Sequence, residues 1–295
     1  MVRKLLVGLI ALAVIVAAGA FAYSRSQQNT SASPPAVPVQ SGRYVALGDS
    51  YTSAPRTGNA AGQPVGCQRS DNNYPHLVAA ELHPVQFVDV SCAGATTEHL
   101  YESQRTNDGT NPPQLDALTP DTVLVTLGIG GNDVGLIGLI QQCGTDDVNA
   151  TPCRNRLTAG GRDQLAQRID QTAAKVGSAL TAIHGKTPNA RVLLVGYPTV
   201  LPDGDGCFPF LPLVPADVAY LRDTADRLNA MLAEQAKTHG ADYVDTATPS
   251  KGHDLCQKAT VKWVEDLVPS APAAALHPNA NGEKAMADAV VRAAG

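Results

Sequence analysis

Short apolar runs and longer amphipathic segments alternate along this chain from about residue 43 onwards. Apolar residues that recur every three or four positions are typical of helices, and short runs rich in valine and leucine are typical of buried strands. The apolar runs predict strands at 44–48, 85–90, 122–127, 191–196 and 241–245. The amphipathic segments predict helices at 74–82, 134–141, 161–184, 215–239 and 279–294, with one or two helical turns at 113–118. A strand followed by a helix, five times over, predicts an α/β domain with a parallel sheet, right-handed crossovers and helices on both faces.

Three of the predicted strands end in turns of small residues, and each turn holds a candidate functional group: Ser50, Gly94 or Asn132. The carboxyl ends of parallel strands meet at one edge of a sheet, which is where open α/β sheets bind ligands. Each group also has a purely structural interpretation. Asp49 and Ser50 can cap a helix, Gly94 can simply make a turn, and Asn132 can cap the next helix. The octapeptide 44–51 alone does not decide between a nucleophile and a cap.

Basic residues at the N-terminus precede a long apolar run without charges. Arg3 and Lys4 are followed by residues 5–23, which include small-residue cleavage patterns such as Ala18-Gly19-Ala20. The run has about 19 residues, which is long for a signal peptide and just long enough to span a bilayer. A cleaved signal peptide and a retained N-terminal anchor both remain open. In either case we expect the rest of the chain to be secreted or held on the outer face of the cytoplasmic membrane.

The remainder divides into a linker and one large domain. Residues 24–42 are polar and rich in proline, which predicts a flexible tether, and the predicted domain covers 43–295. With 44% hydrophobic and 17% charged residues, the composition is ordinary for a globular protein. We expect a monomer.

The charge balance argues against binding to nucleic acid. The chain has 22 basic and 27 acidic residues; without Arg3, Lys4 and Arg25 the balance is 19 minus 27, or −8. An acidic domain with only 4% aromatic residues offers neither a basic footprint nor a surface for stacking bases.

Six cysteines agree with export. An even number in an exported chain favours disulfides, and the absence of any Cys-x-x-Cys spacing argues against a metal site. Six cysteines allow 15 pairings. We favour neighbours in sequence, Cys67–Cys92, Cys143–Cys153 and Cys207–Cys256, because each such pair would fasten an irregular loop without threading the chain.

Four short motifs occur in a familiar order along the chain. Gly48-Asp49-Ser50, then Gly94, then Gly130-Gly131-Asn132-Asp133, then His277-Pro278 resemble the motifs of the SGNH hydrolases, also called the GDSL lipase/acylhydrolase family. The resemblance covers about 43–295. It implies a three-layer α/β/α domain with a five-stranded parallel sheet of the flavodoxin-like SGNH type.

The resemblance also implies a role for each matched residue. Ser50 would be the nucleophile and His277 the base that takes its proton, since a serine hydroxyl is a weak nucleophile without one. The oxyanion formed by attack on an ester would be bound by the backbone N–H groups of Ser50 and Gly94 and by the side-chain amide of Asn132. No cofactor is implied.

One position departs from the family pattern. Many members have an aspartate three residues before the histidine, where this chain has Ala274. Some secreted bacterial members similarly lack it and use a main-chain carbonyl, so we expect the carbonyl of Ala274 to orient the His277 ring. Asp254 and Asp266 are the alternative side-chain acids, and a place in the lining of the substrate pocket is a second alternative for Asp254.

Together these features predict an exported, metal-independent serine esterase or lipase that cleaves carboxylic esters through an acyl-enzyme. Short-chain acyl esters, lipid esters and acylated glycans all fit as substrates. Two alternatives remain: a carbohydrate deacetylase or acyltransferase that uses the same site, and an envelope-binding domain whose site is vestigial.

Overall fold

The computed structural model describes residues 38–295; the predicted signal or anchor and most of the predicted linker lie outside this range. The strands are β1 (Arg43–Gly48), β2 (Gln86–Asp89), β3 (Gln104–Arg105), β4 (Thr110–Asn111), β5 (Thr122–Gly128), β6 (Arg191–Val195) and β7 (Asp242–Val244). The helices are α2 (Ser50–Ser53), α3 (Tyr74–Leu82), α4 (Gly131–Val134), α5 (Leu136–Gln142), α6 (Cys153–Leu157), α7 (Gln164–Lys186), α8 (Pro215–Thr238) and α9 (Ala280–Ala294).

Five parallel strands form the central sheet in the order β2-β1-β5-β6-β7, and β3 and β4 form a separate antiparallel ribbon. The chain goes outward from β1 to β2 and then returns to the other side of β1 to form β5. The order therefore reverses between β1 and β5, and such a reversal opens a crevice at the carboxyl ends of the two strands. Gly48 and Gly128 are paired in register there, so the turns after both strands leave the sheet at one level.

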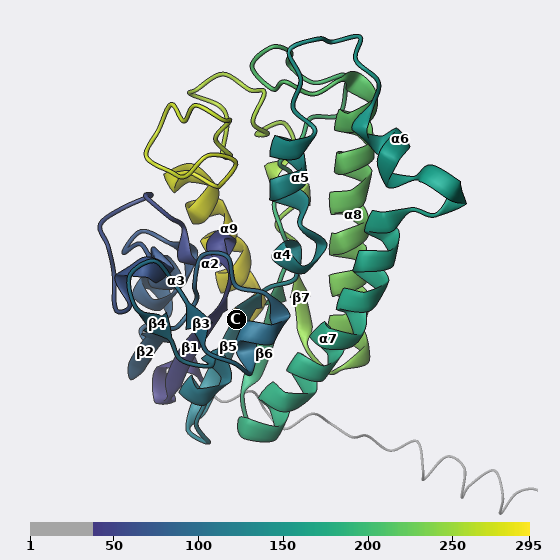
Figure 1. The fold of residues 1–295 in the computed structure, drawn as a ribbon. Helices are drawn as coiled ribbons and strands as arrows, with labels where there is room; N and C mark the ends of the chain where they lie inside the picture. The colour runs from purple at the N-terminus through teal and green to yellow at the C-terminus, as the bar shows by residue number, and fades with distance from the viewer. Residues whose placement is uncertain (1–37) are drawn as a thin grey trace, which may run out of the picture. The chain divides into compact units, whose positions relative to one another are not determined.

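Helices cover both faces of the sheet, as predicted (Figure 1). On β1, Tyr44 and Ala46 belong to the apolar cluster that includes α3 and α9, whereas Val45 and Leu47 belong to the cluster of α7 and α8. This division follows from the strand geometry, since successive side chains point to opposite faces. Every residue of β5 is buried, which explains why its sequence is apolar throughout rather than alternating.

Most predicted boundaries lie within a few residues of the observed ones. One predicted helix, 134–141, is instead divided into α4 and α5 at Gly135, whose φ of +79° interrupts the helix. The linker boundary also differs, because ordered structure begins before Arg43. Val39–Ser41 form a 3-10 turn, and the Val39 side chain is buried in the cluster that includes α9. Burial of that valine fastens the end of the predicted tether to the domain.

All three predicted disulfides are formed: Cys67–Cys92, Cys143–Cys153 and Cys207–Cys256. Each fastens a loop outside the central sheet, and the first links the loop after α2 to the turn after β2.

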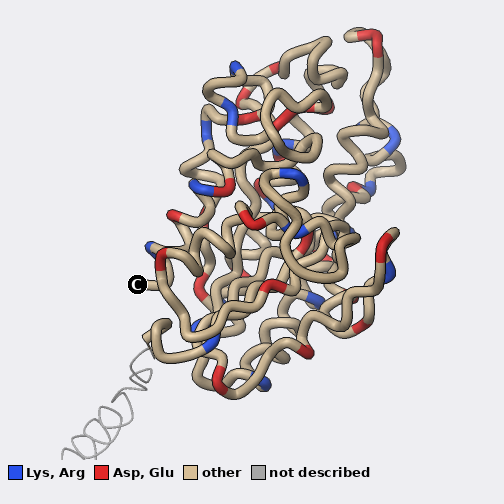
Figure 2. The backbone as a smooth tube through the Cα atoms, turned by 90° about the vertical axis from the view of Figure 1, so that its left-hand side faces the viewer, with Lys and Arg blue, Asp and Glu red and all other residues tan. Residues whose placement is uncertain are grey.

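Basic and acidic residues are interspersed along the side of the domain shown in Figure 2. Within residues 38–295, no helix combines the length and the apolar character that a membrane crossing needs.

Candidate active site

Ser50 stands at the start of α2, directly after β1. Asp49 caps the helix, since its Oδ1 accepts a hydrogen bond from the Tyr51 N–H at 2.9 Å. The helix cap is therefore Asp49, and the Ser50 hydroxyl is not needed for that purpose. The end of β1 is held by the buried amide of Gln114, which accepts from the Gly48 N–H at 2.8 Å and donates to the Gly48 carbonyl at 2.9 Å.

His277 lies beside Ser50, although 227 positions separate them in the sequence. Its Nε2 is 2.8 Å from the Ser50 Oγ, and its Nδ1 is 2.7 Å from the carbonyl oxygen of Ala275. A carbonyl can only accept, so the Nδ1 must carry the ring proton and the Nε2 is free to accept from the serine hydroxyl. This is the arrangement that a general base requires.

The carbonyl that faces the ring belongs to Ala275, so the expectation for Ala274 is wrong by one residue. The backbone N–H of His277 donates to the Ala274 carbonyl at 3.2 Å, which closes a β-turn over 274–277. Leu276 is third in this turn with a φ of +64°, which is typical of a type II turn. The Ala274 carbonyl accepts the hydrogen bond that closes the turn. The central peptide of the turn contains the Ala275 carbonyl, and this carbonyl faces the imidazole.

Both alternative acids are engaged elsewhere. The Asp254 carboxylate accepts from the Cys256 N–H and the Gln257 side chain, and that of Asp266 accepts from Lys262 and the Val268 N–H. The imidazole is thus oriented by backbone rather than by a carboxylate. Burial lowers the pKa of His277, and the hydrogen bond to Ala275 opposes this shift only in part. The imidazole is therefore neutral at neutral pH.

Gly94 lies on the turn 92–95 after β2. The Ala95 N–H donates to the Cys92 carbonyl at 3.0 Å, and Gly94 is third in the turn with a φ of +77°. These features define a type II turn, in which the third residue is usually glycine because other residues are strained at positive φ. The Cys92 N–H donates to the Gly48 carbonyl at 3.0 Å, so this turn is joined to the strand that leads to Ser50.

Asn132, in the first turn of α4, is joined to the same turn. Its Nδ2 donates to the Ala95 carbonyl at 2.8 Å, which uses one of the two amide hydrogens. The neighbouring Asp133 accepts from both the N–H and the hydroxyl of Thr97. The structure thus brings Ser50, Asn132 and His277 together and connects Gly94 to them through hydrogen bonds at two points.

Known proteins resemble this chain in sequence and in structure. Residues 46–285 match the model of the GDSL-like lipase/acylhydrolase family. The chain belongs to this family. Lipase 2 of Streptomyces coelicolor is 36% identical over 286 residues, which cover 94% of this chain and 93% of that protein. Among solved structures, phospholipase A1 from Streptomyces albidoflavus has a TM-score of 0.68 and an extracellular lipase from Streptomyces rimosus one of 0.66. Each is 27% identical to this chain and covers 86% of it and 100% of its own length.

This GDSL-family member is accordingly a carboxylic ester hydrolase with the fold of its family. The resemblance stated from four motifs is confirmed over most of the chain.

Tyr197 is a site residue that the sequence patterns did not reveal. Its hydroxyl donates to Asp49 Oδ2 at 2.6 Å and accepts from the Gly131 N–H at 2.8 Å, so it joins the turns that hold Ser50 and Asn132. Burial raises the pKa of Asp49 to about 7, while the hydrogen bonds from Tyr197 and Tyr51 lower it. The sequence did offer one signal for Tyr197, its position just after the predicted strand 191–196. That place puts it at the same edge of the sheet as Ser50 and Asn132.

A narrow apolar pocket opens beside Ser50 in this GDSL-family enzyme, between α5 and α8. Its lining combines the turns that carry Ser50 and Asn132 with aliphatic side chains: Asp49, Ser50, Tyr51, Gly131, Asn132, Leu136, Ile137, Tyr197, Pro198, Val200, Ala225 and Leu228. Apolar walls with a few polar groups at one end are typical of sites that bind an apolar ligand by a polar head.

Proposed function

We propose that this enzyme hydrolyses carboxylic esters through an acyl-enzyme, with Ser50 as nucleophile and His277 as base. One observation carries the proposal: the His277 ring touches the Ser50 hydroxyl at 2.8 Å and is held from behind by the Ala275 carbonyl at 2.7 Å. A nucleophile, a base and a group that orients the base form the minimal arrangement for acyl transfer.

The reaction begins when the Ser50 oxygen attacks the ester carbonyl and its proton moves to His277 Nε2. The Ala275 carbonyl then accepts a hydrogen bond from an imidazolium rather than an imidazole, which stabilises the positive charge. As the tetrahedral intermediate collapses, His277 donates the proton to the leaving alcohol. Water then attacks the acyl-enzyme by the same steps and releases the acid.

Three donors would stabilise the oxyanion. The Ser50 N–H lies at the start of α2, where helix N–H groups have no partner within the helix. Asn132 keeps one amide hydrogen after donating to Ala95, and the Gly94 N–H is the third. Loss of one such donor commonly raises the barrier by ~3–4 kcal/mol.

The acyl group would occupy the pocket between α5 and α8. Leu136, Val200 and Leu228 line this pocket and would exclude water from an aliphatic chain. We therefore propose acyl esters of lipids as substrates, in keeping with the lipases and the phospholipase to which the chain is similar.

Hydrolysis of a chromogenic butyrate ester by the wild type and by Ser50→Ala tests this function. We expect the variant to lose at least about 10³-fold in kcat with its fold intact. Asp254→Asn and Asp266→Asn serve as controls and should retain turnover within about threefold; a loss of several orders of magnitude in either would contradict a base oriented by backbone alone. Equal activity of Ser50→Ala and the wild type would overturn the proposal. Analysis of the products with glycan or glycerol acceptors present would reveal transfer instead of hydrolysis.

We further propose that the enzyme is exported. The apolar run 5–23 behind Arg3 and Lys4 supports this, as do the three disulfides, which form in oxidising compartments. Mass spectrometry of the mature N-terminus, from culture medium and from membranes, distinguishes a cleaved signal from a retained anchor. Recovery of the intact chain only in the cytoplasm would contradict export.

A further inference from the structure

Gln104 lies in the short ribbon of β3 and β4, next to the turn that holds Gly94, and its side chain is buried. Its Nε2 donates to the carbonyl of Ala93 at 2.8 Å, while its Oε1 is buried without a hydrogen-bond partner in the part of the chain that the structure describes. A buried amide with one end unpaired costs stability relative to an apolar side chain of the same size. Gln104 therefore occupies this position at a cost in stability, and the one hydrogen bond of its side chain goes to Ala93.

The contact that Gln104 makes fixes one particular peptide. Ala93 and Gly94 are the central residues of the turn 92–95, so the Ala93 carbonyl and the Gly94 N–H belong to the same planar group. In a trans peptide the C=O and N–H point in opposite directions. A donor that holds the Ala93 carbonyl on one side therefore directs the Gly94 N–H to the other.

This orientation is the variable part of a β-turn. Type I and type II turns share the same outer residues and differ mainly by a flip of the central peptide, and the φ of +77° at Gly94 corresponds to type II. A flip would reverse the direction of the Gly94 N–H without moving the rest of the turn. Glycine permits both states, so a further contact is needed to select one.

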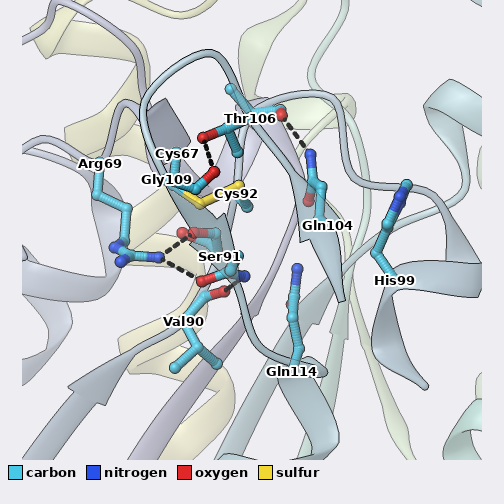
Figure 3. Close-up of a disulfide and its surroundings, with 12 residues drawn as sticks. Cys67, Arg69, Val90, Ser91, Cys92, His99, Gln104, Thr106, Gly109 and Gln114 are labelled. Atoms are coloured by element: carbon cyan, nitrogen blue, oxygen red, sulfur yellow. Dashed lines mark hydrogen bonds between the residues drawn. A yellow bond between two sulfur atoms is a disulfide. The ribbon is translucent and has the colours of Figure 1, made fainter. Parts of the chain in front are cut away.

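The remaining N–H groups of the turn are already used. Cys92 donates to Gly48, Ala93 to Cys67 and Ala95 to Cys92, each at 3.0 Å. Among these four residues, all within the described region, the Gly94 N–H is the one that has no protein acceptor. Figure 3 shows the Cys67–Cys92 disulfide with Gln104 on one side of it and Arg69 on the other. Hydrogen bonds thus hold the turn on several sides and leave the Gly94 N–H available to a ligand.

We propose that Gln104 is a positioning residue that holds the Gly94 N–H toward the oxyanion and polarises it through the shared peptide. A hydrogen bond to the carbonyl of an amide strengthens donation by its N–H, because hydrogen bonds in a chain reinforce one another. The inference rests on the proposed role of Gly94 as an oxyanion donor.

The test compares Gln104→Met and Gln104→Glu with Arg105→Met, a control at the neighbouring exposed position of β3. Methionine keeps the length of the side chain but removes the donor, and glutamate replaces the donor by an acceptor. Active sites are counted with a fluorophosphonate that reacts with Ser50, so misfolded protein does not enter the rates. We expect kcat per titrated site to fall about 10- to 100-fold in both Gln104 variants, with KM within about threefold. We expect no change in Arg105→Met.

A spectroscopic measurement separates positioning from a structural role. The carbonyl stretch of an acyl-enzyme made with a ¹³C-labelled acyl group reports hydrogen bonding to the oxyanion position. We expect this stretch to move to higher frequency in both Gln104 variants. A lower melting temperature with unchanged kcat per site and unchanged stretch would overturn the inference. If Asn132→Ala shifts the stretch and Gln104→Met does not, the inference fails while the proposed function stands; if Ser50→Ala still hydrolyses esters, the proposed function fails.

Discussion

The hydroxyl of Tyr51 donates to the carbonyl of Leu276 at 2.7 Å, and this bond joins the turn of Ser50 to the turn that carries His277. The Tyr51 ring also lies against the imidazole of His277, with 4.9 Å between ring centres. Leu276 is a buried non-glycine residue at positive φ, a conformation that costs on the order of 1–3 kcal/mol and needs support from its surroundings. The bond from Tyr51 supplies part of that support.

Tyr51→Phe should lower kcat up to about tenfold and destabilise the fold by about 1 kcal/mol, because it removes the hydroxyl and keeps the ring. Steady-state kinetics and urea unfolding measure the two effects. Tyr101→Phe is the matched control, since Tyr101 is 48% exposed. A variant with wild-type kcat would show that the Leu276 turn holds His277 without help.

The acidic side of the pH profile should report His277. Burial lowers the pKa of this imidazole below its ordinary 6.5, and protonation removes its ability to accept the Ser50 proton. We therefore expect kcat/KM to fall on acidification with a midpoint below 6.5. The same midpoint in Asp49→Asn would assign it to His277. A midpoint near 7 that disappears in Asp49→Asn would assign it to Asp49 instead.

Asp49 should make stability depend on pH. Its pKa is about 7 in the folded protein, against 3.8 ordinarily, so the folded state holds this proton more tightly than the unfolded chain. The resulting stability is complete below the ordinary pKa and is lost as the pH rises toward 7. Asn does not titrate, so the stability of Asp49→Asn relative to the wild type should increase between about pH 4 and pH 8, by at most ~4 kcal/mol. Urea unfolding at both pH values measures this; a constant difference would contradict it.

The pocket beside Ser50 predicts how chain-length preference can be changed. Ala225 on α8 lines this pocket, and a larger side chain there would occupy space needed by a long acyl chain. We expect Ala225→Leu to lower kcat/KM for decanoate esters about 10- to 100-fold and to leave acetate esters within about threefold. Ala230→Leu, at an exposed position of the same helix, is the control. Equal losses for both esters would exclude this pocket as the acyl site.

The Cys67–Cys92 disulfide should support activity more than overall folding. Cys67 accepts from the Ala93 N–H, and Cys92 begins the turn that presents Gly94. We expect the double variant Cys67→Ser, Cys92→Ser to lose about tenfold or more in kcat while its far-ultraviolet circular dichroism stays native. The double variant of Cys143 and Cys153, a pair further along the chain, should keep its turnover. Full activity after complete reduction would contradict this prediction.

The sequence by itself determined the layers of the fold. The continuous apolar run at 122–127 reflects a strand that is buried on both faces, and the helical spacing of apolar residues at 215–239 reflects a helix that is buried on one face. Both patterns can be predicted because they depend mainly on the local order of apolar and polar side chains. The order of Ser50, Gly94, Asn132 and His277 indicated the family by its resemblance to the motifs of the SGNH hydrolases. Each of these residues also follows or precedes an element whose pattern is visible locally.

Only the tertiary structure decided how peptides and buried polar groups are oriented. The imidazole contacts the carbonyl of Ala275 rather than Ala274 because a turn around Leu276 consumes the earlier carbonyl. Tyr197 donates a hydrogen bond to Asp49, 148 positions away in the sequence, and no local pattern predicts such a pairing. The same local sequence allows both orientations of the central peptide in a turn. Contacts from distant segments therefore decide which orientation is adopted. In this enzyme those contacts come from residues such as Tyr51 and Gln104, which bind backbone carbonyls next to the site.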